Sequence, residues 1–388
     1  MPRLMSIAAV GVALGCCDCT ELPTEAGDHV IYHWDDSEAR LCGGTVPTVD
    51  RFLETVGGHY GWAPDELGPG VEYFWDEELS VNACSWPGTF NCESGMNRPI
   101  VFSNAPIETH ELAHTSRGGH GRPMLGFPPF INEAFASRWS SAVIEYGQPF
   151  LTWPEFLSAA ELRAALEVND AMKLDYGLAF TWWVALESTY GPTKMAEFIV
   201  ELDGVTSAKG VERATRRAFG ISLAESAALA ESLPLASVDD PACELDGLPT
   251  FTWTGRPLVV ERSDAHCDNG DIMNMDGSGG TGWLFALELP DTRTDYYVSL
   301  TLPPGVDPVT KGMYLVECHG EPEFGNPFPY NAASVKNGGA SGTLRWPWRL
   351  RGRQVGRLST DMNSDGAVVL PRVVFERVLT DADRPMPP

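Results

Sequence analysis

Apolar and polar residues follow three different patterns along this 388-residue chain. Residues 29–34 and 71–75 alternate as half-buried β-strands do, and 100–102 is another short β-type run. From 131 to 235, apolar residues recur at helical spacing almost throughout. After 245, short β-type runs are separated by Gly, Pro, Asn and Asp, which is typical of an antiparallel sandwich. The pattern predicts an α+β chain with a small β half, a helical half and a later all-β, sandwich-like region.

Cap and turn residues predict where several helices begin and end. Ser158 and Ser222 each stand three positions before a Glu, which is the form of a capping box. Gly191-Pro192 separates two helices. We expect Asn104 to cap the helix that follows it and Gly118-Gly119 to end that helix.

Length and composition predict two domains. A chain of this length with 43% hydrophobic residues can bury a large core. Asp239-Asp240-Pro241 breaks the helical pattern and marks a boundary. We therefore expect one domain over 24–240, a second over 245–380, and a disordered tail over 381–388.

The strongest candidate for chemistry is His110-Glu111-x-x-His114, followed after 18 residues by Glu133. On a helix, residues four apart project from one face, so both imidazoles can reach one ion. Two imidazoles and a carboxylate fill three corners of a tetrahedral Zn²⁺ site and leave the fourth for water. Glu111 stands where a general base for that water is needed. The alternative is a solvated helix face rich in His and Glu.

These residues resemble the gluzincin branch of the zincin metallopeptidases, and the 18-residue spacing is that of its M1-like group. Asn132-Glu133-Ala134 is similar to the stretch around the third ligand in such enzymes. Ser137 stands where the thermolysin branch has Asp. The match is confined to roughly residues 100–200. The Gly-x-Met-Glu-Asn exopeptidase signature of true M1 aminopeptidases is missing, so the resemblance extends to peptide-bond hydrolysis and not to aminopeptidase activity.

The resemblance implies a zincin-like domain with its cleft between a mostly β half and a helical half. It implies that the strand near 98–103 borders the cleft. It also implies that a Tyr in a helix after the third ligand stabilises the oxyanion, and Tyr176 matches that context. Tyr146 and Tyr190 are competitors, and a core or capping tyrosine is the alternative reading of Tyr176.

A second candidate cation site lies near the C-terminus. Asp361, Asn363 and Asp365 match the first half of a Ca²⁺-binding loop. The twelfth position is Arg372 rather than a bidentate Glu, which favours a plain hairpin turn over a calcium site.

Residues 1–19 have the form of a targeting segment. One Arg precedes an apolar run that is too short to span a bilayer as a permanent helix. The run ends in Ala13-Leu14-Gly15-Cys16, which resembles a bacterial lipobox in which Cys16 becomes acylated; Cys17 is an alternative acceptor. A plain secretory signal and an internal helix are the other interpretations. We expect an exported lipoprotein of the bacterial cell envelope.

The remaining cysteines favour disulfides, because they are even in number in a chain expected to be exported. We expect Cys84–Cys92, across a Trp-Pro-Gly loop, and Cys267–Cys318 within the later domain. A Cys-ligated metal is the alternative, but no Cys-x-x-Cys pair occurs outside the targeting segment and its junction. The six cysteines are Cys42, Cys84, Cys92, Cys243, Cys267 and Cys318.

The net charge of −26 disfavours a nucleic-acid partner and disfavours adhesion to anionic lipid through surface charge. The expected partners are a peptide or protein substrate and the membrane that receives the lipid anchor. The sequence therefore predicts an exported zinc metallopeptidase. The alternative is a catalytically inactive, zinc-containing binding lipoprotein of the cell surface, against which Glu111 argues, because a structural site has no use for a free carboxylate beside its ligands.

Overall fold

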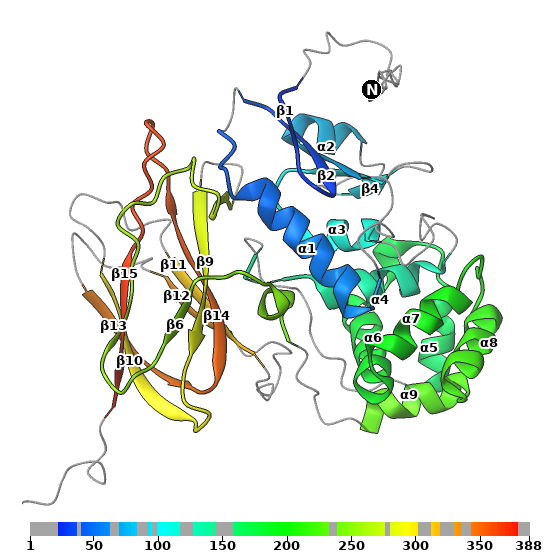
Figure 1. The fold of residues 1–388 in the computed structure, drawn as a ribbon. Helices are drawn as coiled ribbons and strands as arrows, with labels where there is room; N and C mark the ends of the chain where they lie inside the picture. The colour runs from blue at the N-terminus through cyan, green and yellow to red at the C-terminus, as the bar shows by residue number, and fades with distance from the viewer. Residues whose placement is uncertain are drawn as a thin grey trace, which may run out of the picture.

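In the computed structural model, an N-terminal part with a small sheet and many helices lies beside a β-rich C-terminal part (Figure 1). This is the α+β class that the sequence predicts. The structure describes residues 22–36, 40–62, 70–83, 92–94, 99–116, 127–141, 143–144, 158–232, 239–275, 280–301, 312–318, 330–334 and 343–378.

A five-stranded sheet forms the β half of the N-terminal part, in the order β1-β2-β3-β5-β4. The strands predicted at 29–34, 71–75 and 100–102 are confirmed as β2 (Val30–Trp34), β3 (Val71–Trp75) and β5 (Ile100–Ser103), which run parallel. β1 (Thr24–Ala26) and β4 (Cys92–Ser94) are antiparallel to their neighbours. Among the described strands, β4 lies at one end of the sheet and β5 lies between β3 and β4.

Helix α1 (Thr45–His59) lies where the two parts of the molecule meet (Figure 1). Its buried Val49, Phe52 and Val56 recur at helical spacing. The helix contacts β2 on one side and the β-rich part, at β8 (Ile272–Asn274), on the other. The first residue of α1, Thr45, contacts Asn274, and its last residue, His59, contacts Glu244, so both ends of the helix lie at the junction between the two parts.

The helical half follows the predicted pattern. The capping boxes are confirmed, because Ser158 Oγ accepts a hydrogen bond from Glu161 N and Ser222 Oγ accepts one from Glu225 N. Gly191 separates two helices with a positive φ of 79°, which suits glycine. The elements are α2 (Glu77–Ala83), α3 (Thr109–Thr115), α4 (Pro129–Trp139), α5 (Ala159–Leu166), η2 (Ala171–Lys173), α6 (Tyr176–Tyr190), α7 (Pro192–Glu201), α8 (Ala208–Phe219) and α9 (Leu223–Ser232).

The prediction that Asn104 caps α3 is wrong, because this helix begins at Thr109. The sheet explains the late start. Tyr32 Oη donates to the carbonyl of Pro106 and Tyr73 Oη donates to that of Ala105, at 2.6 and 2.8 Å. These hydrogen bonds hold the preceding segment against the sheet in a non-helical conformation. At the other end α3 stops at Thr115, while Gly118-Gly119 lies outside the described residues.

The β-rich part consists of two sheets, as the sequence predicts, with orders β13-β10-β15-β7 and β12-β11-β14-β9-β6; β8 also pairs with β9. Phe285, Val298 and Phe375 belong to the apolar core of this part. The elements are η3 (Pro241–Glu244), β6 (Thr250–Thr252), β7 (Leu258–Val260), β9 (Gly280–Glu288), β10 (Thr294–Thr301), β11 (Gly312–Glu317), β12 (Tyr330–Ser334), β13 (Thr343–Leu350), β14 (Arg353–Asp361) and β15 (Arg372–Arg377).

One hydrophobic cluster extends across both parts. Met275, Leu284 and Val355 of the β-rich part are buried in the same cluster as Val46 of α1 and Ala113 of α3. The β-rich part is therefore packed against the helical half through a shared core, rather than joined to it by the chain alone.

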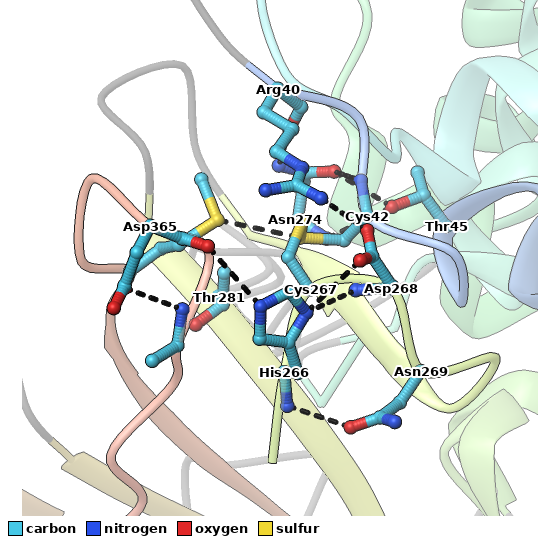
Figure 2. Close-up of a disulfide and its surroundings, with 12 residues drawn as sticks. Arg40, Cys42, Thr45, His266, Cys267, Asp268, Asn269, Asn274, Thr281 and Asp365 are labelled. Atoms are coloured by element: carbon cyan, nitrogen blue, oxygen red, sulfur yellow. Dashed lines mark hydrogen bonds and ion pairs between the residues drawn. A yellow bond between two sulfur atoms is a disulfide. The ribbon is translucent and has the colours of Figure 1, made fainter.

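The described disulfides differ from the expected pairing, and the one formed by Cys42 joins the two parts. Cys42 is bonded to Cys267 and Cys243 is bonded to Cys318, so the predicted Cys267–Cys318 bond is wrong. The expectation assumed that each bond would stay within one domain, whereas backbone pairing brings Cys42 against the β-rich part: Gly43 N donates to Cys267 O at 2.7 Å. Figure 2 shows this region. The predicted Cys84–Cys92 bond lies outside the described residues, because Cys84 is not among them.

Asn274 forms hydrogen bonds with the start of α1 and the residues before it, beside this disulfide (Figure 2). Its Oδ1 accepts hydrogen bonds from Cys42 N at 2.7 Å and from Thr45 Oγ1 at 2.9 Å, and its Nδ2 donates to Arg40 O at 3.0 Å. Asn274 is fully buried, and these contacts satisfy its amide inside the interface.

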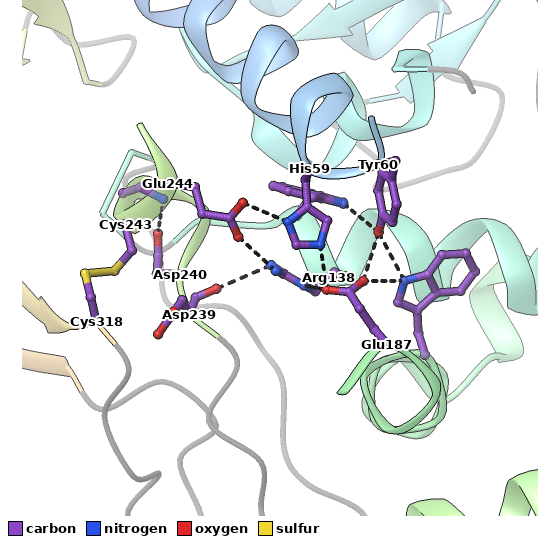
Figure 3. A network of polar contacts seen from close by, with 12 residues as sticks. His59, Tyr60, Arg138, Glu187, Asp239, Asp240, Cys243, Glu244 and Cys318 are labelled. Carbon is purple, nitrogen blue, oxygen red and sulfur yellow. Dashed lines mark hydrogen bonds and ion pairs between the residues drawn. A yellow bond between two sulfur atoms is a disulfide. The ribbon is translucent and has the colours of Figure 1, made fainter. Parts of the chain in front are cut away.

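A closed ring of four charged side chains forms a second junction (Figure 3). His59 Nε2 lies 3.0 Å from Glu187 Oε1 and His59 Nδ1 lies 2.8 Å from Glu244 Oε2. Arg138 completes this junction ring with Nε 2.9 Å from Glu187 Oε1 and Nη2 3.1 Å from Glu244 Oε1. Its members come from α1, α4, α6 and η3, so the ring links η3, the first element of the β-rich part, to three helices of the N-terminal part.

Charge balance explains how the junction ring tolerates burial, because two cations face two carboxylates. Burial lowers the pKa of His59, but the hydrogen bonds to Glu187 and Glu244 outweigh it and raise this pKa to about 9. Burial raises the pKa of Glu187, yet Arg138 and His59 bring it down to about 2. All four groups are therefore charged at neutral pH.

Within the described residues, no helix is both long enough and apolar enough to cross a membrane. The predicted targeting segment 1–19, with Cys16, and the predicted disordered tail 381–388 lie outside those residues.

Candidate metal site

Helix α3 places two imidazoles side by side. Leu112 and Ala113 are fully buried and turn one face of the helix into the core. His110 and His114 then share another face, with ring centroids 4.9 Å apart and ring planes nearly perpendicular at 87°. This is the geometry that the four-residue spacing predicts for a helix.

Helix α4 brings a carboxylate to the same point. Glu133 Oε2 lies 3.0 Å from His110 Nε2 and 3.6 Å from His114 Nε2. One donor atom from each of the three side chains lies within 4.8 Å of the other two, so the group could hold a metal ion. Metal–ligand bonds of about 2.0–2.1 Å place the corners of a tetrahedral ion about 3.3 Å apart. The donor set and its spacing fit such an ion.

The charge state of Glu133 suits a ligand. Burial raises the pKa of this carboxyl, but the charges of His114 and His110 and the hydrogen bonds from both rings outweigh burial and hold the pKa far below its ordinary value. The carboxylate is therefore ionised in the folded protein, as metal binding requires.

Tyr176, at the first residue of α6, lies over the same site. Asp175 caps this helix, since its Oδ1 accepts a hydrogen bond from Leu178 N at 3.0 Å. The Tyr176 ring centroid is 6.0 Å from that of His110. Burial raises the pKa of Tyr176 strongly, and the charges of Glu133 and Glu111 and a hydrogen bond to Glu133 raise it further. The phenol therefore keeps its proton and can donate a hydrogen bond.

The structure thus brings together His110, His114, Glu133 and Tyr176, four of the residues that the sequence singles out for this site. Glu111, the fifth, lies close enough to Tyr176 for its charge to raise the pKa of that phenol. Tyr190, a competitor for the role of Tyr176, lies at the far end of α6 and packs on Phe219, with ring centroids 4.7 Å apart. Tyr146, the other competitor, lies outside the described residues.

Sequence reasoning missed Ser140. Its Oγ lies 3.1 Å from His110 Nδ1 and donates a hydrogen bond to Ala136 O at 3.3 Å. Because that hydroxyl hydrogen is used, Oγ accepts from His110 Nδ1–H. In the neutral imidazole that binds a metal ion, the lone pair of His110 then lies on Nε2, the nitrogen that faces Glu133. Ser140 follows Glu133 by seven positions, which is about two helical turns, and this spacing is the signal that could have found it.

Glu108, the residue that precedes α3, also lies against the site. Burial raises the pKa of its carboxyl, and the charge of His110 and a hydrogen bond from the His110 backbone partly oppose that rise. Nothing in the sequence pattern distinguishes Glu108 from the other glutamates near the two histidines.

The candidate calcium loop forms a turn around residues 363–367. Asn363 N donates to Ala367 O, Gly366 N donates to Asn363 O, and Asp365 Oδ1 accepts from Ala367 N, at 2.9, 2.9 and 3.0 Å. Gly366 has a φ of 89°, a conformation that favours glycine. One carboxylate oxygen of the half-matching calcium loop is thus used within the turn itself.

No protein-family model and no curated protein matches this chain. Several solved structures show a distant likeness, among them the following three. CBM35 from Cellvibrio japonicus Abf62 is 12% identical over 34% of this chain and 90% of its own, with a TM-score of 0.18. The Arthrobacter globiformis T6 isomalto-dextranase complexed with panose is 14% identical over 36% of this chain and 22% of its own, with a TM-score of 0.18. The family GH115 4-O-methyl-alpha-glucuronidase BtGH115A is 11% identical over 57% of this chain and 32% of its own, with a TM-score of 0.19. These TM-scores are too low to inform the fold or function of this chain.

Proposed function

We propose that this protein is an exported zinc-dependent hydrolase that cleaves peptide bonds. The observation that carries the proposal is the convergence of His110, His114 and Glu133 from two helices on one point. Three protein ligands leave one corner of a tetrahedron for water or substrate, which is the composition of catalytic zinc sites rather than structural ones.

In this proposal the chain's own groups have separate roles. A bound Zn²⁺ would supply the electrophile that polarises the scissile carbonyl and activates water near neutral pH. Glu111 accepts the proton of the attacking water and delivers it to the leaving amine. Tyr176 donates a hydrogen bond to the developing oxyanion, and its raised pKa keeps that donor protonated.

The described sheet also suggests how a peptide could be held. β4 lies at the end of the sheet order, and α3 packs against both β4 and β5. An extended chain that pairs with the outer side of β4 would run along the sheet next to the helix that carries both histidines. This supports a peptide or protein substrate over a small polar one.

Two disulfides indicate an extracellular or otherwise oxidising compartment. Export by the targeting segment 1–19 agrees with that compartment. Acylation of Cys16, and hence a lipid anchor in the bacterial cell envelope, remains part of the proposal and is tested by mass analysis of membrane-extracted protein.

The decisive experiment is the Glu111→Gln variant of zinc-loaded protein. We expect one zinc per chain in the wild type and in the variant, with peptide hydrolysis lost by at least about a hundredfold in the variant, as expected when a general base is removed. The matched control is Glu167→Gln, which changes an exposed glutamate at the end of α5. Full activity in Glu111→Gln would overturn the assigned base. Zinc binding by a wild type that hydrolyses no peptide in a broad screen would favour the inactive binding lipoprotein.

A further inference from the structure

The short segment after α4 connects the β-rich part to the metal site. On one side, Ser141 N donates to Thr109 Oγ1 at 2.9 Å, next to the ligand His110, and Ser140 Oγ accepts from His110 Nδ1. On the other side, Arg357 Nη1 of β14 donates to Val143 O at 2.7 Å. These residues therefore contact α3 and the β-rich part at the same time.

Asp240, the residue before η3, joins η3 to this segment through Ser141. Its Oδ1 accepts a hydrogen bond from Ser141 Oγ at 2.6 Å and another from Ala242 N at 2.9 Å, which caps η3. Ser141 Oγ in turn accepts from Ile144 N at 3.1 Å. Asp240, Ser141 and Thr109 are all buried to about 1% exposure or less, so water cannot replace these partners without opening the structure.

The position of Asp240 is fixed by the β-rich part. Cys243 N donates to Asp240 O at 2.8 Å, and Cys243 is bonded to Cys318, the residue after β11 (Figure 3). The junction ring adds a second attachment, since Arg138 Nη1 also donates to Asp239 O at 3.3 Å. Asp240 is thus held from the β-rich side and holds Ser141 on the metal-site side.

We infer that Asp240 is a positioning residue for the metal centre, through which the β-rich part orients His110. The inference rests on the proposed metal site. The path runs from the Cys243–Cys318 disulfide to Asp240, from Asp240 to Ser141, and from Ser141 and its neighbour Ser140 to α3 at Thr109 and His110. Groups that orient a metal-binding histidine typically change metal affinity by about 10–100-fold when removed.

The test measures the zinc dissociation constant by competition with a chromogenic chelator, with circular dichroism as the check on folding. Asp240→Ala should weaken zinc binding by about tenfold, at the lower end of that range because Asp240 acts through Ser141. Asp240→Asn should restore most of the affinity, because the amide oxygen can accept both hydrogen bonds. Wild-type affinity in a folded Asp240→Ala variant would overturn the inference.

The two disulfides provide a matched pair of variants in case Asp240→Ala fails to fold. Replacing Cys243 and Cys318 by Ser removes the bond that anchors η3. Replacing Cys42 and Cys267 by Ser removes a bond between the two parts that takes no part in the path through Asp240. We expect the first double variant to bind zinc about tenfold more weakly and the second to keep wild-type affinity while unfolding at lower temperature. Equal loss in both would overturn the inference. Wild-type zinc binding without hydrolysis would contradict the proposed function and leave this inference standing.

Discussion

His110 Nε2 and Glu133 Oε2 lie 3.0 Å apart, although the two residues are 23 positions apart in the chain and belong to different helices. Glu133 Oε2 also lies 3.6 Å from His114 Nε2, so one carboxylate oxygen faces both imidazoles. With a cation, the same atoms are spaced as ligands. The contact between these two residues is therefore the structural basis of every prediction about the metal.

Replacing the carboxylate ligand should remove zinc before it removes the fold. Glu133→Ala leaves two imidazoles, and we expect zinc affinity to fall by several orders of magnitude, because one of three protein ligands and the only anionic one is lost. Isothermal titration calorimetry and metal content after dialysis measure this. Ser137→Ala, one turn further along α4 and also buried, is the control and should keep its zinc. Stoichiometric zinc in Glu133→Ala would contradict the ligand set.

Replacing Tyr176 should lower the turnover rate without changing zinc binding. Tyr176→Phe removes the hydroxyl and keeps the ring, so zinc content should be unchanged while kcat falls by about 10²–10³, the cost of one oxyanion donor. Steady-state kinetics on a peptide substrate measure the change. Tyr190→Phe, at the other end of the same helix, should retain wild-type kcat. A large rise in KM with unchanged kcat would assign Tyr176 to substrate binding instead.

The junction ring predicts a loss of stability at alkaline pH. The pKa of His59 is raised from 6.5 to about 9 in the folded protein, so its contribution is fully present below pH 6.5 and is lost as pH rises through about 9. The shift corresponds to on the order of 3 kcal/mol. The melting temperature of the wild type should exceed that of His59→Gln clearly at pH 6 and only slightly at pH 10. A difference that stays constant across this range would contradict a charged His59.

The shared core predicts that the β-rich part is not removable. Deleting 245–388 would expose Val46, Ala113 and their neighbours, which now pack with residues of that part, and would break both disulfides. We expect the truncated chain to lack a cooperative thermal transition and to bind hydrophobic dyes. A truncated protein that unfolds cooperatively and binds zinc would show that the N-terminal part folds alone.

The sequence by itself determined the class of the fold, the order of its parts and the three side chains that could hold a metal ion. His110 and His114 needed only helical periodicity to share a face, and the capping boxes at Ser158 and Ser222 needed only a local spacing of three. Such features depend on backbone geometry within one or two turns, which nearby residues decide.

Only the tertiary structure decided which distant residues meet. The pairing of Cys42 with Cys267, the use of Ser140 by His110 and the junction ring all depend on contacts between segments far apart in the sequence. The late start of α3 has the same cause, since Tyr32 and Tyr73 of the sheet bind the carbonyls that precede it. Spacing along a chain carries no information about such contacts, because the packing of the shared core brings the segments together.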